Sequence, residues 1–257
     1  MIKDYDLSKK IILITGGASK GYGKQIVEIL AELGATVVIS SRDLEKAERK
    51  CEFLKNHGFK VFPACLDLLE HKQIEKEIER LHNKFGTFDI LINNAVVHAE
   101  NNIDSLDLEE WNNNLNANIT GTMLITKIIG SNMFSKKGGS IINMGSIYGV
   151  ISPDHKIYGN SGINSPLVYG ICKASIVQMT KYLATYWAPK VRVNCISPGG
   201  LFDNQDEFFV DNYCKKTPLK RMANQEDLKG IIALLASDAS SYITGQNFIV
   251  DGGWTAL

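Results

Sequence analysis

The chain has 257 residues, of which 44% are hydrophobic and 22% charged, an ordinary globular composition. Its 28 basic and 28 acidic residues cancel, so no overall field attracts nucleic acid or an anionic membrane surface. No apolar run approaches the about 20 residues that span a bilayer, and the apolar run near the N-terminus is too brief for a signal peptide. The length favours one domain over residues 1–257.

Five cysteines form no Cys-x-x-Cys pair, and no histidine stands beside them at zinc-ligand spacing. We therefore expect reduced thiols, no metal site and a cytoplasmic protein.

Short β-branched runs alternate with longer amphipathic stretches along the chain. Strands are predicted at 10–15, 35–40, 59–67, 88–93, 139–146, 191–197 and 246–250. Helices are predicted at 23–33, in a charged stretch ending near 56, and at 70–85, 108–133, 166–187 and 225–237. Strands that are apolar on both faces and alternate with helices indicate a parallel sheet covered on both sides. Right-handed crossovers then give a doubly wound α/β fold of the Rossmann type, with about seven strands.

The turn after the first strand, "LITGGASKGYGK", is rich in glycine. Gly17, Gly21 and Gly23 allow a ligand to approach the backbone closely. The helix that follows offers unpaired N–H groups and a positive dipole end, which suit a pyrophosphate. The alternative is a glycine-rich turn without a ligand.

Two segments, 147–165 and 199–224, fall outside the alternation of strands and helices. Both follow strands, so we expect them at the carboxyl edge of the sheet, where ligands bind in such folds. The first contains His155, Tyr158, Asn160 and Asn164. We expect it to line a pocket for a polar substrate; the alternative is a surface loop without function.

Tyr169 stands four residues before Lys173 in "LVYGICKAS", within a predicted helix. This spacing places both side chains on one helix face. A cation within about 4–6 Å favours the ionised form of a phenol, and such a phenol exchanges a proton with a carbinol or carbonyl oxygen. The alternative is a tyrosine and a lysine that merely pack on one helix.

These motifs together resemble the short-chain dehydrogenase/reductase family over nearly the whole chain. The resemblance rests on Gly17-x-x-x-Gly21-x-Gly23, on "NNAV" at 93–96, on Tyr169-x-x-x-Lys173 and on "SPGG" at 197–200. Three positions depart from the family pattern, because Gly16 stands where its threonine is expected, and Val96 and Asp203 replace a glycine and a later threonine. The interval between Ser146 and Tyr169 spans twenty-three positions, where the family commonly has about a dozen, so the segment 147–165 contains an insertion. This inserted segment more narrowly resembles dehydrogenases of bacterial surface-sugar and flagellin modification.

The resemblance implies a catalytic tetrad. Tyr169 is the acid/base, Ser146 holds the substrate oxygen, Lys173 supports Tyr169 and holds the nicotinamide ribose, and Asn118 anchors a water chain to Lys173. The simpler reading of Ser146 is a strand-end cap, and that of Asn118 is a satisfied polar group within a helix.

The resemblance also implies a dinucleotide cofactor. Its expected contacts are Gly17, Ser19, Lys20, Gly21, Tyr22, Gly23, Ser41, Arg42, Asp67, Leu68, Asn94, Ala95, Tyr169, Lys173, Pro198 and Gly199.

The cofactor preference depends on charge near the adenosine ribose. An acidic residue at the end of the second strand binds the 2′-hydroxyl of NAD and repels the 2′-phosphate of NADP. Ser41 occupies that position, Arg42 follows it, and Lys20 adds a second cation, whereas Asp43 counts slightly against a phosphate. We therefore expect NADP(H), with NAD(H) as the alternative.

The expected activity is hydride transfer between a ketone and a secondary alcohol, on a small carbonyl or alcohol substrate of sugar type. One alternative is a 3-oxoacyl reductase of lipid synthesis, and another is a regulatory protein that binds NADP(H) without turnover. The family implies a mobile substrate lid at 199–224 and a homotetramer assembled through 108–133 and 166–187. Internal packing explains the apolar residues of these two helices equally well.

Overall fold

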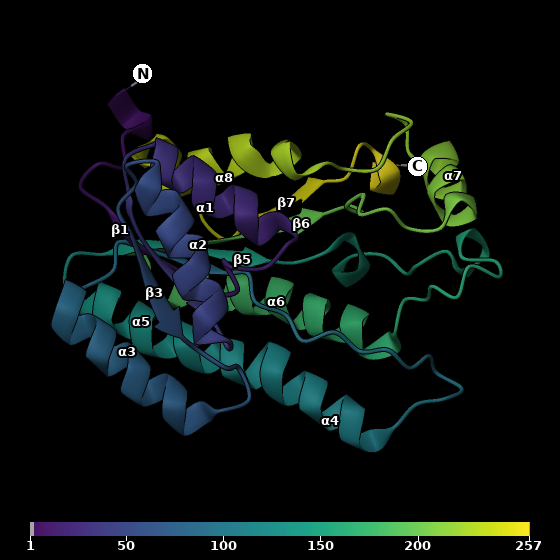
Figure 1. Cartoon of the computed structure of the whole chain (residues 1–257), viewed down its shortest axis with the longest axis horizontal. Helices are drawn as coiled ribbons and strands as arrows, with labels where there is room; N and C mark the ends of the chain where they lie inside the picture. The colour runs from purple at the N-terminus through teal and green to yellow at the C-terminus, as the bar shows by residue number, and fades with distance from the viewer. Residues whose placement is uncertain (1–2, 257) are drawn as a thin grey trace.

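A computed structural model describes residues 3–256 of the chain. Seven parallel strands form one sheet in the order β3-β2-β1-β4-β5-β6-β7 (Figure 1). The strands are β1 (Ile11–Ile14), β2 (Thr36–Ser41), β3 (Val61–Cys65), β4 (Ile90–Asn93), β5 (Gly139–Met144), β6 (Val191–Pro198) and β7 (Asn247–Val250). The predicted Rossmann-type doubly wound sheet is confirmed.

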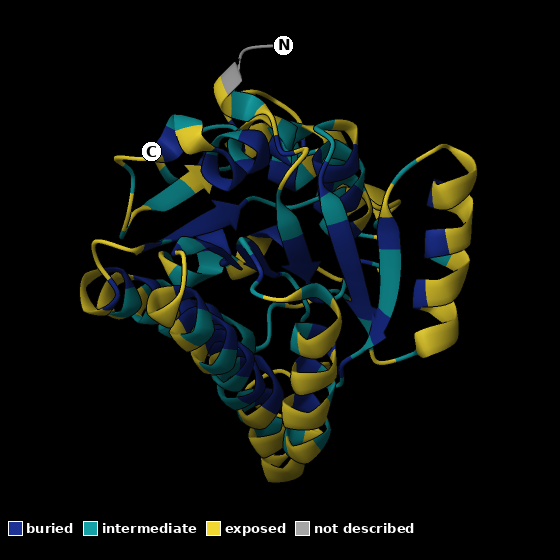
Figure 2. Cartoon of the chain, turned by 90° about the vertical axis from the view of Figure 1, so that its left-hand side faces the viewer, coloured by how far each residue is buried: buried dark blue, intermediate teal, exposed yellow. Residues whose placement is uncertain are grey.

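Helices cover both faces of this sheet. They are α1 (Tyr22–Glu32), α2 (Leu44–Asn56), α3 (His71–Phe85), α4 (Leu108–Leu115), α5 (Thr122–Ser135), α6 (Leu167–Tyr186), α7 (Glu207–Lys216) and α8 (Lys229–Ala236). Successive residues of a strand point to opposite faces, so Ile12 and Ile14 pack with α1, α2 and α8, whereas Leu13 packs with α3, α5 and α6. Figure 2 shows the buried sheet between helices whose outer faces are exposed.

The stretch predicted as one helix over 108–133 runs on to Ser135 and is interrupted. Between α4 and α5 lies a π-helical turn, Asn116–Gly121. A Cβ added to Gly121 would lie 2.2 Å from the carbonyl oxygen of Leu68, so only glycine permits this packing on the segment after β3. Such π-helical turns occur frequently at functional sites.

Helix α7 lies inside the segment 199–224, where no helix was predicted. Asp206 caps it by accepting a hydrogen bond from the backbone N–H of Phe209, and only Phe209 and Tyr213 are buried on its inner face. The predicted helix 225–237 divides into a 3₁₀ turn, Gln225–Leu228, and α8. Short amphipathic stretches give weak periodic signals, which is why sequence reasoning missed α7.

Helix α7 packs against the inserted segment 147–165 at one end of the molecule (Figure 1). Together they enclose a third hydrophobic cluster, separate from the two cores of the sheet, which contains Ile147, Ile157, Tyr158, Phe209, Tyr213, Met222 and Trp254.

Among residues 3–256, no helix is long and apolar enough to cross a membrane. No group of three or more His, Cys, Asp or Glu side chains in the same range is arranged to hold a metal ion.

Candidate active site

The carboxyl ends of the strands open into a cleft of about 780 Å³. It extends from Arg42 and Lys46 after β2 to Ser146 after β5 and Tyr169 on α6. The predicted site residues that line it are Ser19, Gly21, Tyr22, Ser41, Arg42, Asp67, Leu68, Asn94, Ala95, Ser146, Tyr169, Lys173, Pro198 and Gly199. Residues from six different strand ends thus meet in one cavity.

Four predicted residues lie beside the cleft without lining it: Gly17, Lys20, Gly23 and Asn118. Gly17 and Gly23 shape the turn from inside. A Cβ on Gly17 would lie 2.9 Å from Ile14 Cγ2, and one on Gly23 would lie 2.6 Å from both the Gly16 carbonyl oxygen and Ser19 Oγ. The side chain of Lys20 has no place in the pocket wall, and its backbone carbonyl accepts a hydrogen bond from Gln225 Nε2.

Thr15 ties the glycine turn to the segment after β4. Its hydroxyl accepts hydrogen bonds from the backbone N–H groups of Asn94 and Ala95, each at 3.0 Å. Gly16 has φ +64°, and a Cβ there would lie 2.8 Å from Ala95 Cα. Thr15 therefore keeps a structural role, and the turn accommodates one additional residue. Sequence reasoning left the roles of Thr15 and Gly16 open.

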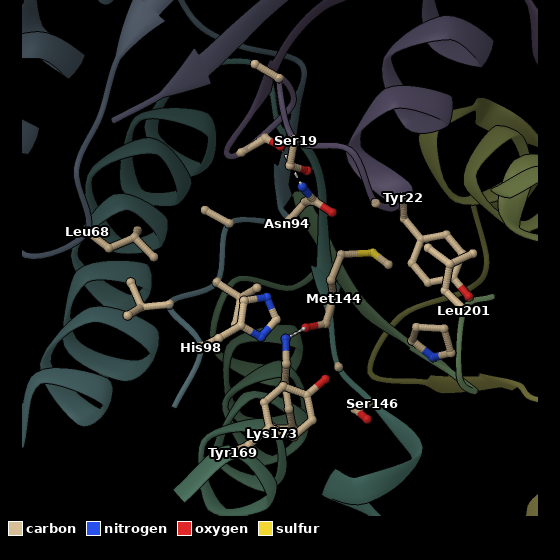
Figure 3. A pocket seen from close by; sticks show the side chains of 18 of the residues that line it. Ser19, Tyr22, Leu68, Asn94, His98, Met144, Ser146, Tyr169, Lys173 and Leu201 are labelled. Carbon is tan, nitrogen blue, oxygen red and sulfur yellow. Dashed lines mark hydrogen bonds between the residues drawn. The ribbon is translucent and has the colours of Figure 1, made fainter. Parts of the chain in front are cut away.

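Tyr169 and Lys173 lie one turn apart on α6, as their spacing predicts. The Lys173 ammonium lies 5.7 Å from the centroid of the Tyr169 ring and donates a 2.8 Å hydrogen bond to the Met144 carbonyl oxygen. Lys173 is buried, whereas Tyr169 is partly open to the pocket. Figure 3 shows both side chains and Ser146 facing one space. The hydrogen bond from Lys173 to the carbonyl of Met144, the last residue of β5, could not be predicted from the sequence.

Ser146 stands just past β5, and the short segment after it packs directly on α6. A Cβ on Gly149 would lie 2.6 Å from the backbone carbonyl carbon of Lys173. This close approach holds the serine beside the α6 turn that carries Tyr169. Ser146 Oγ also accepts a hydrogen bond from the Tyr148 backbone N–H at 3.2 Å, so its hydroxyl remains able to donate one to a substrate oxygen.

Asn118 is buried in the π-helical turn. Its side chain accepts from the Val97 backbone N–H and donates to the Val97 carbonyl, both at 2.8 Å, and it donates to Asn114 Oδ1 at 3.2 Å. It thus fixes the segment after β4, which forms one wall of the pocket. Its predicted link to Lys173 stays a prediction.

The β2 end of the pocket carries cations. Arg42 and Lys46 both line it. Asp43 caps α2 by accepting from the backbone N–H of Lys46 at 3.2 Å, and this hydrogen bond lowers the pKa of the Asp43 carboxyl. Its other oxygen lies 3.5 Å from Lys46 Nζ. Asp43 lines the same end of the pocket and its lowered pKa keeps it negatively charged, so this end combines two cations with one carboxylate.

The four polar or aromatic residues expected to line the pocket from the insertion do not line it. His155 and Asn160 are exposed, Tyr158 is buried, and Asn164 donates a hydrogen bond to the Glu100 carbonyl oxygen. The loop contributes Ile147 and Tyr148 instead. The expectation was wrong in these residues because the insertion folds back on α7 and buries its aromatic side chain there.

Three further phenols near the cleft have restricted chemistry. Burial raises the pKa of Tyr22 and of Tyr148, and it raises the pKa of Tyr213 to about 12. All three therefore stay protonated at neutral pH and are available as hydrogen-bonding groups.

The residues present fit a dinucleotide. Gly21 at the N-terminus of α1 makes no side-chain cap, so the first N–H groups of that helix remain available beside the glycine turn. Such a terminus favours a pyrophosphate. The cleft then continues past Asn94 to the buried Lys173.

The sheet order, the glycine turn and the paired Tyr169 and Lys173 define a dinucleotide-binding oxidoreductase of the Rossmann class. The family model described as "Enoyl-(Acyl carrier protein) reductase" matches residues 17–255. The chain belongs to the short-chain dehydrogenase/reductase family.

Two curated relatives illustrate the range of this family. The 3-oxoacyl-[acyl-carrier-protein] reductase of Thermotoga maritima is 33% identical and covers 96% of this chain and 98% of its own length. The NAD-dependent glycerol dehydrogenase of Listeria innocua is 32% identical and covers 98% of this chain and 96% of its own length.

Two solved structures show the same fold over nearly their whole length. A gluconate 5-dehydrogenase from Burkholderia cenocepacia, in complex with NADP and tartrate, has a TM-score of 0.90 at 28% identity and covers 99% of this chain and 98% of its own. A short-chain dehydrogenase from Leptospira borgpetersenii with bound NAD+ has a TM-score of 0.88 at 38% identity and covers 97% and 94%. The narrower resemblance to surface-sugar and flagellin-modifying enzymes finds no support in these comparisons.

Proposed function

We propose that this protein is an NADP(H)-dependent oxidoreductase that interconverts a ketone and a secondary alcohol. The observation that carries this proposal is the shared pocket of Ser146, Tyr169 and Lys173 beside the glycine turn. When bound, the nicotinamide supplies or accepts the hydride.

In the proposed reaction, the Tyr169 hydroxyl donates its proton to the carbonyl oxygen during reduction and takes it back during oxidation. Ser146 donates a hydrogen bond to the same oxygen and fixes its position. The Lys173 ammonium, held by the Met144 carbonyl, keeps positive charge near the phenol and favours its anionic form after proton transfer. Asn118 contributes by holding the wall segment at Val97.

We propose NADP(H) as the preferred cofactor because Arg42 and Lys46 line the β2 end of the pocket and outnumber the one carboxylate there, Asp43. A 2′-phosphate gains charge-assisted hydrogen bonds from such cations. The NADP in the gluconate 5-dehydrogenase structure and the NAD+ in the Leptospira structure leave both cofactors open on grounds of resemblance.

For the substrate, a sugar-type or polyol compound is our first candidate. The glycerol and gluconate dehydrogenases among the similar proteins support it. The second candidate is a 3-oxoacyl reductase, which the Thermotoga relative favours. A cofactor-sensing regulatory role is a weaker alternative, because both Tyr169 and Lys173 are present.

The direct test follows NADPH oxidation optically with three probes: a hydroxyketone such as dihydroxyacetone, a plain ketone such as cyclohexanone, and acetoacetyl coenzyme A. We expect turnover of at least one ketone, with kcat/KM larger for NADPH than for NADH. Tight NADPH binding without turnover of any of the three would support the sensing alternative and contradict the proposed reaction.

We propose, further, a single-domain homotetramer in the cytoplasm. All five cysteines are free, which suits a reducing compartment. Large apolar side chains are exposed on the outer faces of α4, α5 and α6: Leu108, Met123, Phe134, Leu167, Ile171, Tyr182 and Tyr186. Light scattering of the purified chain tests this assembly, and a monomeric mass would refute it.

A further inference from the structure

The inserted segment 147–165 bridges the two walls of the pocket at its substrate end. On one side, Asn164 Nδ2 donates a 3.0 Å hydrogen bond to the Glu100 carbonyl oxygen after β4. On the other side, Asp154 forms an ion pair with Lys216 on α7. The Tyr158 ring stacks on Phe209 of α7, with centroids 5.4 Å apart and planes within 10°.

The same insertion fixes one pocket-lining side chain. The Tyr148 and Tyr158 hydroxyl oxygens lie 2.9 Å apart in a hydrogen bond, and Tyr158 is buried against α7. Tyr148 lines the pocket. Because its phenol stays protonated, one of the two hydroxyls donates to the other, and the Tyr148 oxygen keeps free hydrogen-bonding capacity on the pocket wall.

His98 stands on the opposite wall, in the segment after β4. Its neighbour Val97 is held at both backbone groups by Asn118, which fixes the backbone from which the imidazole projects. The ring is open to the pocket (Figure 3). The surrounding protein and the Lys173 ammonium both lower the pKa of His98, and no residue among 3–256 forms a hydrogen bond with it. A neutral imidazole of this kind offers one N–H donor and one nitrogen acceptor to a ligand.

Among the described residues, the charged side chains around this end include no cation dedicated to an acidic substrate group. The cations that line the cleft are Arg42 and Lys46 at the far end, and Lys173, whose ammonium is bound to the Met144 carbonyl. Glu100 is the acidic residue near the substrate end. A substrate carboxylate or phosphate would find no dedicated partner there, whereas a hydroxyl group would.

We propose that His98 is a specificity-determining residue that hydrogen-bonds a hydroxyl group next to the reacting carbon of a small, uncharged polyol or hydroxyketone. Tyr148 bounds the same subsite from the wall that the insertion builds. This inference rests on the proposed function, because it assigns the substrate class of the same pocket.

The test measures binding rather than turnover. Isothermal titration calorimetry follows xylitol and D-sorbitol binding to the enzyme saturated with NADP+, in the wild type, His98→Phe and His98→Gln. We expect about tenfold weaker binding with phenylalanine, which removes the hydrogen bond, and recovery of most of the affinity with glutamine, which restores a donor and an acceptor. The matched control is His155→Phe, on the exposed part of the insertion, which should bind both polyols like the wild type.

Cyclohexanone reduction by the same variants separates recognition from structure. We expect His98→Phe to lower kcat/KM for dihydroxyacetone about tenfold more than kcat/KM for cyclohexanone, because the plain ketone has no hydroxyl for His98 to bind. Polyol affinity that is absent in the wild type, or equal in wild type and His98→Phe, would overturn the inference. An equal loss for cyclohexanone and polyols would also overturn it. Polyol binding that depends on His98, without turnover of any ketone, would overturn the proposed function and reduce this inference to a polyol-binding role for His98.

Discussion

At the β1–β2 end of the pocket, the lining residues come from the compact glycine turn after β1 and from the first residues after β2. At the β5–β6 end, the strand ends and α6 are joined by Ile147 and Tyr148 from a long insertion and by Tyr213 from α7, and the insertion and α7 pack against each other. The first end is specified by glycines within a few residues of one another, such as Gly17 and Gly23. The second depends on contacts such as Tyr158 on Phe209, which join distant parts of the chain. The cofactor end is therefore locally encoded, and the substrate end is encoded by tertiary packing.

The largest expected effect lies where the two ends meet. Tyr169→Phe removes the proton donor, and we expect kcat to fall by about a thousandfold while the cofactor dissociation constant changes less than about twofold. Initial rates together with fluorescence titration of NADPH measure both quantities. Tyr242→Phe, at a fully exposed tyrosine, is the matched control and should match the wild type. Substantial residual turnover in Tyr169→Phe would remove the phenol from its proposed role.

A single added methyl group in the glycine turn tests whether close backbone packing builds the cofactor end. Gly23→Ala forces a Cβ within 2.6 Å of the Gly16 carbonyl oxygen, so the turn must move. We expect the cofactor to bind about tenfold more weakly, a loss of about 1.4 kcal/mol in binding free energy.

Gly230→Ala is the control for this change, because a Cβ there meets no atom within 4 Å. The free energy of unfolding of the protein should rise by about 0.5–1 kcal/mol, because alanine favours helix α8 over the unfolded chain, and cofactor affinity should not change. Equal cofactor affinity in Gly23→Ala and the wild type would contradict the view that close backbone packing builds this end.

The cofactor preference gives a smaller expected effect. Arg42→Ala should lower the ratio of kcat/KM with NADPH to kcat/KM with NADH by about tenfold, because one charge-assisted contact is lost. Arg49→Ala, which removes an exposed arginine of α2 that is paired with Glu45 and does not line the pocket, is the control. An unchanged ratio in Arg42→Ala would count against NADP(H) as the preferred cofactor.

The smallest expected effect concerns the ion pair between the insertion and α7. Lys216→Ala should lower the free energy of unfolding by at most about 1 kcal/mol, since the lysine is half exposed and such pairs contribute little. Denaturant titration measures it. A loss of several kcal/mol would show that charge, rather than the aromatic stack of Tyr158 and Phe209, holds the substrate end together.

The same contrast explains how much could be predicted from sequence. Alternating apolar runs located the strands and most helices, and the glycine turn, Ser146, Tyr169 and Lys173 came together as expected. His98 was not identified from the sequence, because a single histidine in a loop carries no periodic signal. Tyr158 was expected in the pocket, whereas the structure buries it under α7. Both depend on where the insertion folds, and its length gave no indication of that.

The widened turn at Asn116–Gly121 has a consequence for the long helix that contains it. An α-helix rotates by about 100° for each residue, so one surplus residue is absorbed here without turning α5 away from the sheet. Deleting a single residue from this turn would restore regular winding and rotate Asn118 relative to Gly121. Either the amide would lose Val97 or the glycine would leave Leu68. The surplus residue thus allows the helix to keep two contacts at once, Asn118 with Val97 and Gly121 with Leu68, which regular α-helical spacing would not place together.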